Sequence, residues 1–191
     1  MPSVAAAVLT TCVWTVLLAT AWSQGSPTHD AVRPQDLQGW DKTQWRMSEA
    51  EVKRLIHGRW RSATKQEREE DRDVYAGSVL QDVKIAGRNC TGFFGFSRSD
   101  RQLARVAFQC GRFPMPNTEA SLVFDRLLAD LQVQFGVPSK VGRNNSGHTG
   151  VYADYALWRF PSTIVELTSL KPNDTERAVV VAYSRVSDNQ P

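Results

Sequence analysis

Histidine and cysteine are scarce in this chain of 191 residues, which contains three of each. His29, His57 and His148 stand far apart, and neither Cys90 nor Cys110 has a second cysteine or histidine at the short spacing of zinc ligands. The sequence also lacks a Gly-x-Ser-x-Gly nucleophile elbow and a glycine loop ending in Lys-Ser or Lys-Thr. We therefore expect no metal site, no cofactor and no catalytic residue, and predict that the chain is not an enzyme.

One enzymatic alternative stays open. His148 could act as a general base with Asp154 orienting its ring, which would make the chain a hydrolase. The simpler interpretation is a solvated histidine, because residues 141–150 are polar and glycine-rich and read as a mobile loop. The hydrolase is our third functional hypothesis.

An excess of charge of one sign is also missing, since 23 Lys and Arg face 20 Asp and Glu for a net charge of +3. No RNP, zinc-finger or basic-zipper pattern accompanies this small excess, so we expect no nucleic-acid partner. With 41% hydrophobic and 23% charged residues, the composition is that of a soluble globular protein, which excludes a coiled coil, a collagen and a disordered tail.

The N-terminus reads as an export signal. Residues 4–22 carry no charge and include the small residues Ala19-Thr20-Ala21, which suit signal peptidase. We predict a signal peptide over 1–23 and an exported protein, periplasmic or secreted, with no stable membrane span after cleavage. The alternative is a retained single-span anchor, because about 18 to 20 apolar residues can cross a bilayer.

A flexible leader is expected over 24–39, where glycine and proline interrupt any apolar pattern. A capping box from Ser48 to Glu51 then begins a short helix, which continues through Leu55 to Trp60 with Gly58 as a plausible stop. Residues 61–73 are charged and read as a solvated connector or a frayed helix.

Strands and a second helix follow. Pro116-Asn117 begins this helix and Gly136 ends it, and the expected strands are 74–85, 90–96, 103–110, 151–160, 163–170 and 177–186. We predict one α+β domain over 40–187, in the order α-β-β-β-α-β-β-β. It consists of two helix-plus-three-strand halves, 40–112 and 113–187. Both helices pack on one face of an antiparallel sheet.

The strands 90–96 and 103–110 should form a hairpin. Facing Cys90 with Cys110 also places Gly92 by Phe108, Phe94 by Val106 and Phe96 by Ala104, which makes one face wholly apolar. An even shift of register would preserve that face, but the cysteines fix the pairing. If Cys12 leaves with the signal peptide, the remaining pair suggests a disulfide between Cys90 and Cys110.

The surface feature above background is basic, because five arginines and a single acid, Asp100, lie between 88 and 112. The alternative is that these arginines only solubilise an exposed sheet face. Two tryptophans near the leader could pack under the first helix or contact a partner. Our candidate binding residues are Arg98, Arg101, Arg105, Trp40 and Trp45.

The segment from Trp45 to Val52 and the helix exit Phe135-Gly136-Val137-Pro138 resemble small bacterial envelope proteins. These are the SmpA/OmlA-type outer-membrane assembly lipoproteins and the β-lactamase-inhibitory-protein-like repeat domains. The first helix departs from the pattern, because Gly58-Arg59-Trp60 replaces its Gly-x-Pro exit, and no lipid-bearing cysteine begins the mature chain.

This resemblance implies a non-enzymatic envelope protein that acts as a protein-interaction or binding module. Its partner would be another envelope protein or an anionic envelope surface. The alternative is a carrier that holds an apolar or amphipathic small ligand between helices and sheet.

Overall fold

The computed structural model describes residues 36–69, 73–143, 151–171 and 175–186. The predicted signal peptide, most of the leader, His148 and residues 144–150 of the predicted loop lie outside these ranges. Within them, no helix is long and apolar enough to cross a membrane. All of the described residues belong to one compact unit, Pro34–Pro191.

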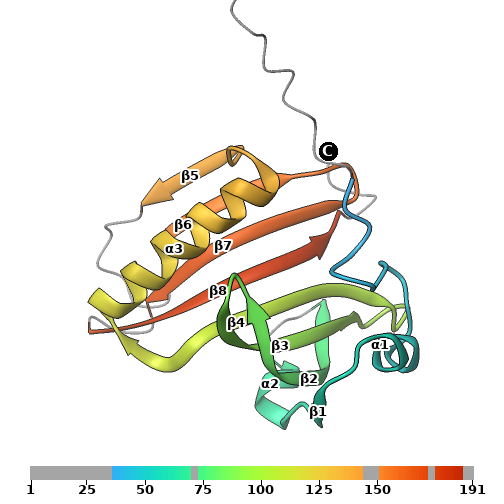
Figure 1. Cartoon of the computed structure of the whole chain (residues 1–191). Helices are drawn as coiled ribbons and strands as arrows, with labels where there is room; N and C mark the ends of the chain where they lie inside the picture. Colours follow the sequence, from blue (N-terminus) through green and yellow to red (C-terminus); the bar gives the residue numbers. More distant parts are fainter. Residues whose placement is uncertain (1–35, 70–72, 144–150, 172–174, 187–191) are drawn as a thin grey trace, which may run out of the picture. The chain divides into compact units, whose positions relative to one another are not determined.

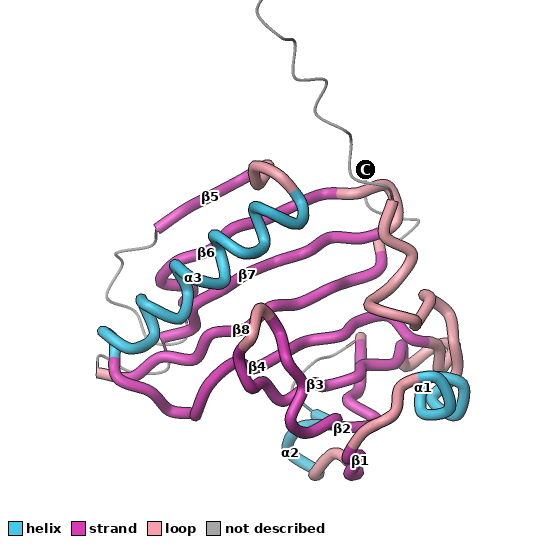
Figure 2. The backbone as a smooth tube through the Cα atoms, viewed as in Figure 1, coloured by secondary structure: helices cyan, strands magenta, loops and turns pink. Residues whose placement is uncertain are grey.

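An eight-stranded antiparallel sheet dominates the fold and confirms the α+β class (Figures 1 and 2). Its strand order is β1-β2-β3-β4-β8-β7-β6-β5, so each half of the chain forms a meander and the two meanders join where β4 pairs with β8. The elements are α1 (Glu49–Leu55), β1 (Arg59–Ser62), α2 (Lys65–Glu69), β2 (Val74–Ile85), β3 (Arg88–Ser97), β4 (Leu103–Pro116), α3 (Asn117–Phe135), β5 (Lys140–Arg143), β6 (Val151–Arg159), β7 (Thr163–Lys171) and β8 (Glu176–Arg185).

The element order differs from the prediction because the structure adds β1, α2 and β5. The predicted first helix is shorter: it ends at Leu55, and Trp60 lies in β1 opposite Leu80. The charged connector contains α2, which Thr64 and Glu67 cap reciprocally. The start of the predicted mobile loop is β5, an edge strand of four residues paired with β6.

The hairpin register is confirmed from Cys90 to Gly95 and shifts at the end of β3. Cys90 faces Cys110, Gly92 faces Phe108 and Gly95 faces Arg105. A bulge then pairs Phe96 with Leu103, so the predicted pair of Phe96 with Ala104 is wrong. The extra residue lets both Phe96 and Leu103 enter the core, where both are fully buried.

Helix α3 covers one half of the sheet. It contacts β4, β7 and β8 (Figure 1), and Phe135 near its end packs edge-to-face against Trp158, Phe160 and Tyr183. The helix ends at Gly136, whose φ of 78° lies in the left-handed region that favours glycine. Its buried stripe consists of Ala120, Val123, Phe124, Leu127, Leu131 and Phe135.

Residues 36–47, which we call the covering segment, lie over the same face against β3, β4 and β7, and α1 lies against β2. Trp40 packs against Phe94 and Phe108 with ring centroids 5.9 and 4.6 Å apart. The capping box of α1 is present, and Glu49 accepts a hydrogen bond from Ser78 of β2. Helices α1 and α3 thus lie on one face of the sheet, and the covering segment also covers part of that face.

The Arg61–Glu67 pair joins β1 to α2 through two hydrogen bonds of 2.7 and 2.8 Å. These bonds are the main reason why the pKa of Glu67 falls from 4.5 to about 2. A carboxyl whose pKa is lower in the folded than in the unfolded chain stabilises the fold at pH values above its unfolded pKa. This stabilisation is lost as the pH falls from about 4.5 toward 2.

We therefore expect Glu67→Gln to lower the free energy of unfolding by about 1 kcal/mol at pH 6 and to have a much smaller effect near pH 2. Urea unfolding across this pH range measures the difference. Glu119→Gln is the control, because the Glu119 pair with Arg112 is more exposed and its loss should change stability by less than about 0.5 kcal/mol. A penalty for Glu67→Gln that is the same at both pH values would contradict the expectation.

Candidate binding surface

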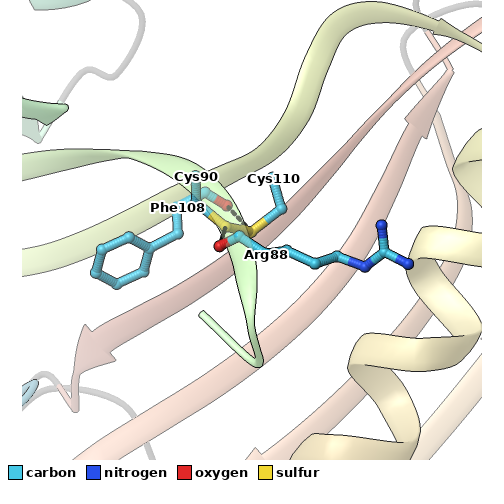
Figure 3. The surroundings of a disulfide bond; sticks show 4 residues. All are labelled: Arg88, Cys90, Phe108 and Cys110. Atoms are coloured by element: carbon cyan, nitrogen blue, oxygen red, sulfur yellow. Dashed lines mark hydrogen bonds between the residues drawn. A yellow bond between two sulfur atoms is a disulfide. The ribbon is translucent and has the colours of Figure 1, made fainter. Parts of the chain in front are cut away.

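A disulfide joins Cys90 and Cys110 across the β3–β4 pair, as predicted (Figure 3). Their Cα atoms are 4.1 Å apart, and both side chains are buried on the face that α3 and the covering segment cover. The bond fixes which residues of β3 and β4 point to the opposite face, because one residue of slippage would exchange the two faces.

The five arginines of the hairpin divide into two groups. Arg98 and Arg101 lie at the turn between β3 and β4, and Arg105 follows in β4 opposite Gly95. Arg88 and Arg112 lie at the other end of the hairpin, where Arg112 pairs with Glu119 at 3.2 Å. The structure thus brings together the three arginines named as candidate binding residues and separates them from the other two.

The turn that carries Arg98 lies against the segment before β2. The Arg98 backbone N–H donates to the Asp73 carbonyl at 3.0 Å, and its Nη2 donates to the Arg68 carbonyl at 2.8 Å. Arg185 at the end of β8 approaches Asp100 at 3.7 Å. Because Asp100 lies within the turn and Asp73 lies against it, the turn has mixed charge rather than a purely basic surface.

Both candidate tryptophans make internal contacts. Trp40 lies on Phe94 and Phe108, and the Trp45 Nε1–H donates to Thr163 Oγ1 at 2.7 Å. These contacts tie the covering segment to the sheet, and contact of either indole with a partner stays a prediction.

The sheet face opposite α3 is partly exposed, as the alternation of residues along its strands predicts. On β4, Val106 and Phe108 are fully buried, whereas Ala107 and Gln109 between and beyond them are partly exposed. On β8, Val180 is likewise partly exposed between buried Val179 and Val181. We call this the open face; its partly exposed members include Thr91, Phe93, Arg105, Ala107, Gln109, Tyr155, Leu157, Ile164, Glu166, Val180 and Ser184.

The open face is weakly polar at its centre and basic toward its edge. One row runs across the sheet from Phe93 through Ala107 and Ala182 to Glu166 and Leu157. The row continues to Val79 and Arg61 beyond Phe93 and to Lys140 beyond Leu157, so Glu166 is the one charge in its middle and both of its ends are basic. Arg159 and Lys140 lie on the β6 and β5 side, and the Lys140 ammonium is 5.6 Å from the centre of the Tyr155 ring.

The two edges of the sheet are poorly suited to pairing with another strand. Both β1 and β5 are four residues long, and each carries two basic residues. Short, charged edge strands resist the addition of a further strand. Contact through the flat open face is therefore the mode that this sheet favours.

The residues considered for catalysis are placed differently. Asp154 does not stand free, because its carboxylate is 3.1 Å from Arg177 Nη1, and Arg177 Nε donates to the Asn117 side chain at the start of α3. His148 lies outside the described residues, which contain no cluster of His, Cys, Asp and Glu able to hold a metal ion. The Asp154–Arg177–Asn117 network has a structural use: it joins β6, β8 and α3.

The space between α3 and the sheet is filled by aromatic side chains, with Phe135 against Trp158 and Tyr183. A shallow hollow lies elsewhere, at the corner between β4 and α3, and is lined by Arg112, Pro114, Met115, Pro116, Thr175 and Glu176. Comparison with protein-family models, curated proteins and solved structures finds no match to this chain.

Proposed function

We propose that the chain is an exported, non-enzymatic protein of the cell envelope that binds another protein through the open face. The observation that carries the proposal is the contrast between the two faces of β4 and β8. One face is buried under α3 and the covering segment, and the other presents partly exposed, mostly uncharged side chains. A flat surface of this composition is typical of a protein-binding face with a polar rim.

Export is proposed on the sequence of residues 1–23 together with the disulfide. Disulfides persist in oxidising compartments and are rare in the cytosol. A periplasmic or secreted location therefore suits both features, and the resemblance to small envelope proteins adds to the proposal.

The chemistry of the open face also describes the partner. An apolar patch without long side chains on the partner would complement Phe93, Ala107 and Leu157. Acidic residues beside that patch would complement Arg159 and Lys140. The partner is thus a folded protein with a flat apolar centre and an acidic margin, and not an extended strand.

The test places a charge in the middle of the open face. Ala107→Glu should weaken partner binding at least about tenfold, because it places a larger, charged side chain in the centre of the contact. Photo-crosslinking in cells from a benzoylphenylalanine at position 107 identifies the partner. The affinity of the purified partner is then measured for the wild type, for Ala107→Glu and for the control variant.

Ala50→Glu is the matched control, because Ala50 is exposed in the first turn of α1 and the change is chemically identical. A crosslinker at position 50 should give no adduct. Equal affinity of the two glutamate variants would count against the open face. If position 107 gives no protein adduct and the chain binds phosphatidylglycerol vesicles, the protein partner is wrong and the anionic envelope surface is the partner instead.

A further inference from the structure

Helix α3 has a second apolar stripe that faces solvent. The side chain of Leu122 is 70% exposed and that of Val133 is 90% exposed, and exposed Ala129 lies between them. Residues at these spacings of seven and four fall on one line along a helix. We call Leu122, Ala129 and Val133 the outer stripe. Large apolar side chains this exposed and aligned mark an interaction surface.

The outer stripe is flanked by opposite charges. Arg126 and Asp130 are exposed on the same side of it, at about 40° and 80° around the helix from Leu122, given a turn of about 100° per residue. No ion pair within the described part of the chain engages either of them. Both charges are therefore available to a partner that packs on the stripe.

The stripe complements a second copy of itself in one orientation. If two α3 helices pack antiparallel with Leu122 against Val133 of the second copy, two-fold symmetry creates the same contact twice. Arg126 then lies within about one residue rise, about 1.5 Å along the axis, of Asp130 of the second copy. Parallel packing would instead place the two copies of Arg126 at the same height on opposite flanks of the contact, so that neither would face Asp130 of the second copy. The charges therefore select the antiparallel pair.

We propose that the chain self-associates through antiparallel packing of α3 on α3 of a second copy, with two Arg126–Asp130 contacts between the copies. The apolar contact is short, because Leu122 and Val133 are separated by about 16 Å along the helix. The dimer is accordingly weak and depends on concentration. Since α3 and the open face lie on opposite sides of the sheet, the dimer leaves both open faces accessible, which doubles the number of sites per particle.

Sedimentation equilibrium tests the proposal on the chain expressed with its own N-terminal segment and purified in its processed form. Arg126→Asp and Asp130→Arg should each raise the dimer dissociation constant roughly tenfold, because each variant faces like charges across the pair. The double variant R126D/D130R exchanges the two charges and should return the constant to within about threefold of the original.

Arg54→Asp is the matched control, because it changes the net charge by the same amount at an exposed helical arginine of α1, and it should leave the dimer unchanged. A chain that stays monomeric at all concentrations would overturn the proposal, and so would a double variant as weak as its parents. Ala107→Glu, which tests the open face, should leave the dimer intact, so the two proposals fail separately.

Discussion

Replacing Cys90 and Cys110 together by alanine lowers the free energy of unfolding by about 3 kcal/mol. The two cysteines are separated by 20 residues in sequence, and their bond removes loop-closure entropy from the unfolded chain. Alanine is the suitable replacement because both positions are buried, and a serine hydroxyl there would need a hydrogen-bond partner. Urea unfolding of the oxidised wild type and the double variant measures the difference.

The same protein allows a chemical control. In the native exported chain, neither cysteine should react with a thiol reagent, and both should react after reduction in denaturant. Wild type unfolded in the presence of a reductant should resemble the double variant in stability. Two reactive thiols in the native protein, or equal stability of the oxidised wild type and the variant, would show that the bond is absent from the working molecule.

The hairpin was predictable because two independent signals agree there. The alternation of apolar and polar residues assigns each residue of β3 and β4 to one face of the sheet. Several registers preserve that assignment, and the cysteine pair selects one of them. The bulge at Phe96 was not predictable from that pattern. It arises because Leu103 is needed in the core and also pairs with the covering segment, through Arg46 and Met47, which are distant in sequence.

Other elements carried weaker signals. The Thr64-x-x-Glu67 capping box that begins α2 is visible in the sequence, but its charged surroundings favour reading it as a connector. Strands as short as β1 and β5 have too few residues to show alternation, so Trp60 reads as the continuation of a helix. Such elements form because longer neighbours offer them a paired edge.

The open face depends on a pairing that no local pattern specifies. Neighbouring strands in each meander could be paired from their turns, whereas β4 and β8 meet only in the folded chain, with Ala107 beside Ala182. The contact of Arg98 with Arg68 and Asp73 is also tertiary, so the sequence alone makes the hairpin turn look more basic than it is. The arginines were visible in the sequence, and their neighbours were not.

Phe108→Ala should cost about 3 to 5 kcal/mol of stability, because it empties a fully buried site on which Trp40 of the covering segment packs. Phe108 is fully buried, and its ring centroid lies 4.6 Å from that of Trp40 and 6.2 Å from that of Tyr183. Across the β3–β4 pair, Gly92 makes room for this ring: a Cβ at Gly92 would lie 2.8 Å from Phe108 Cε1. The site is therefore shaped around the phenyl group, and its loss leaves a cavity.

Phe113→Ala provides the matched control within the same strand, because Phe113 is 54% exposed and the chemical change is identical. Its effect should stay within about 0.5 kcal/mol. Near-UV circular dichroism adds a local readout, since the Trp40 ring loses its fixed neighbour in Phe108→Ala alone. If the two variants lose similar stability, Trp40 does not rest on Phe108, and the covering segment must be held chiefly by its hydrogen bonds to Leu103 and Thr163.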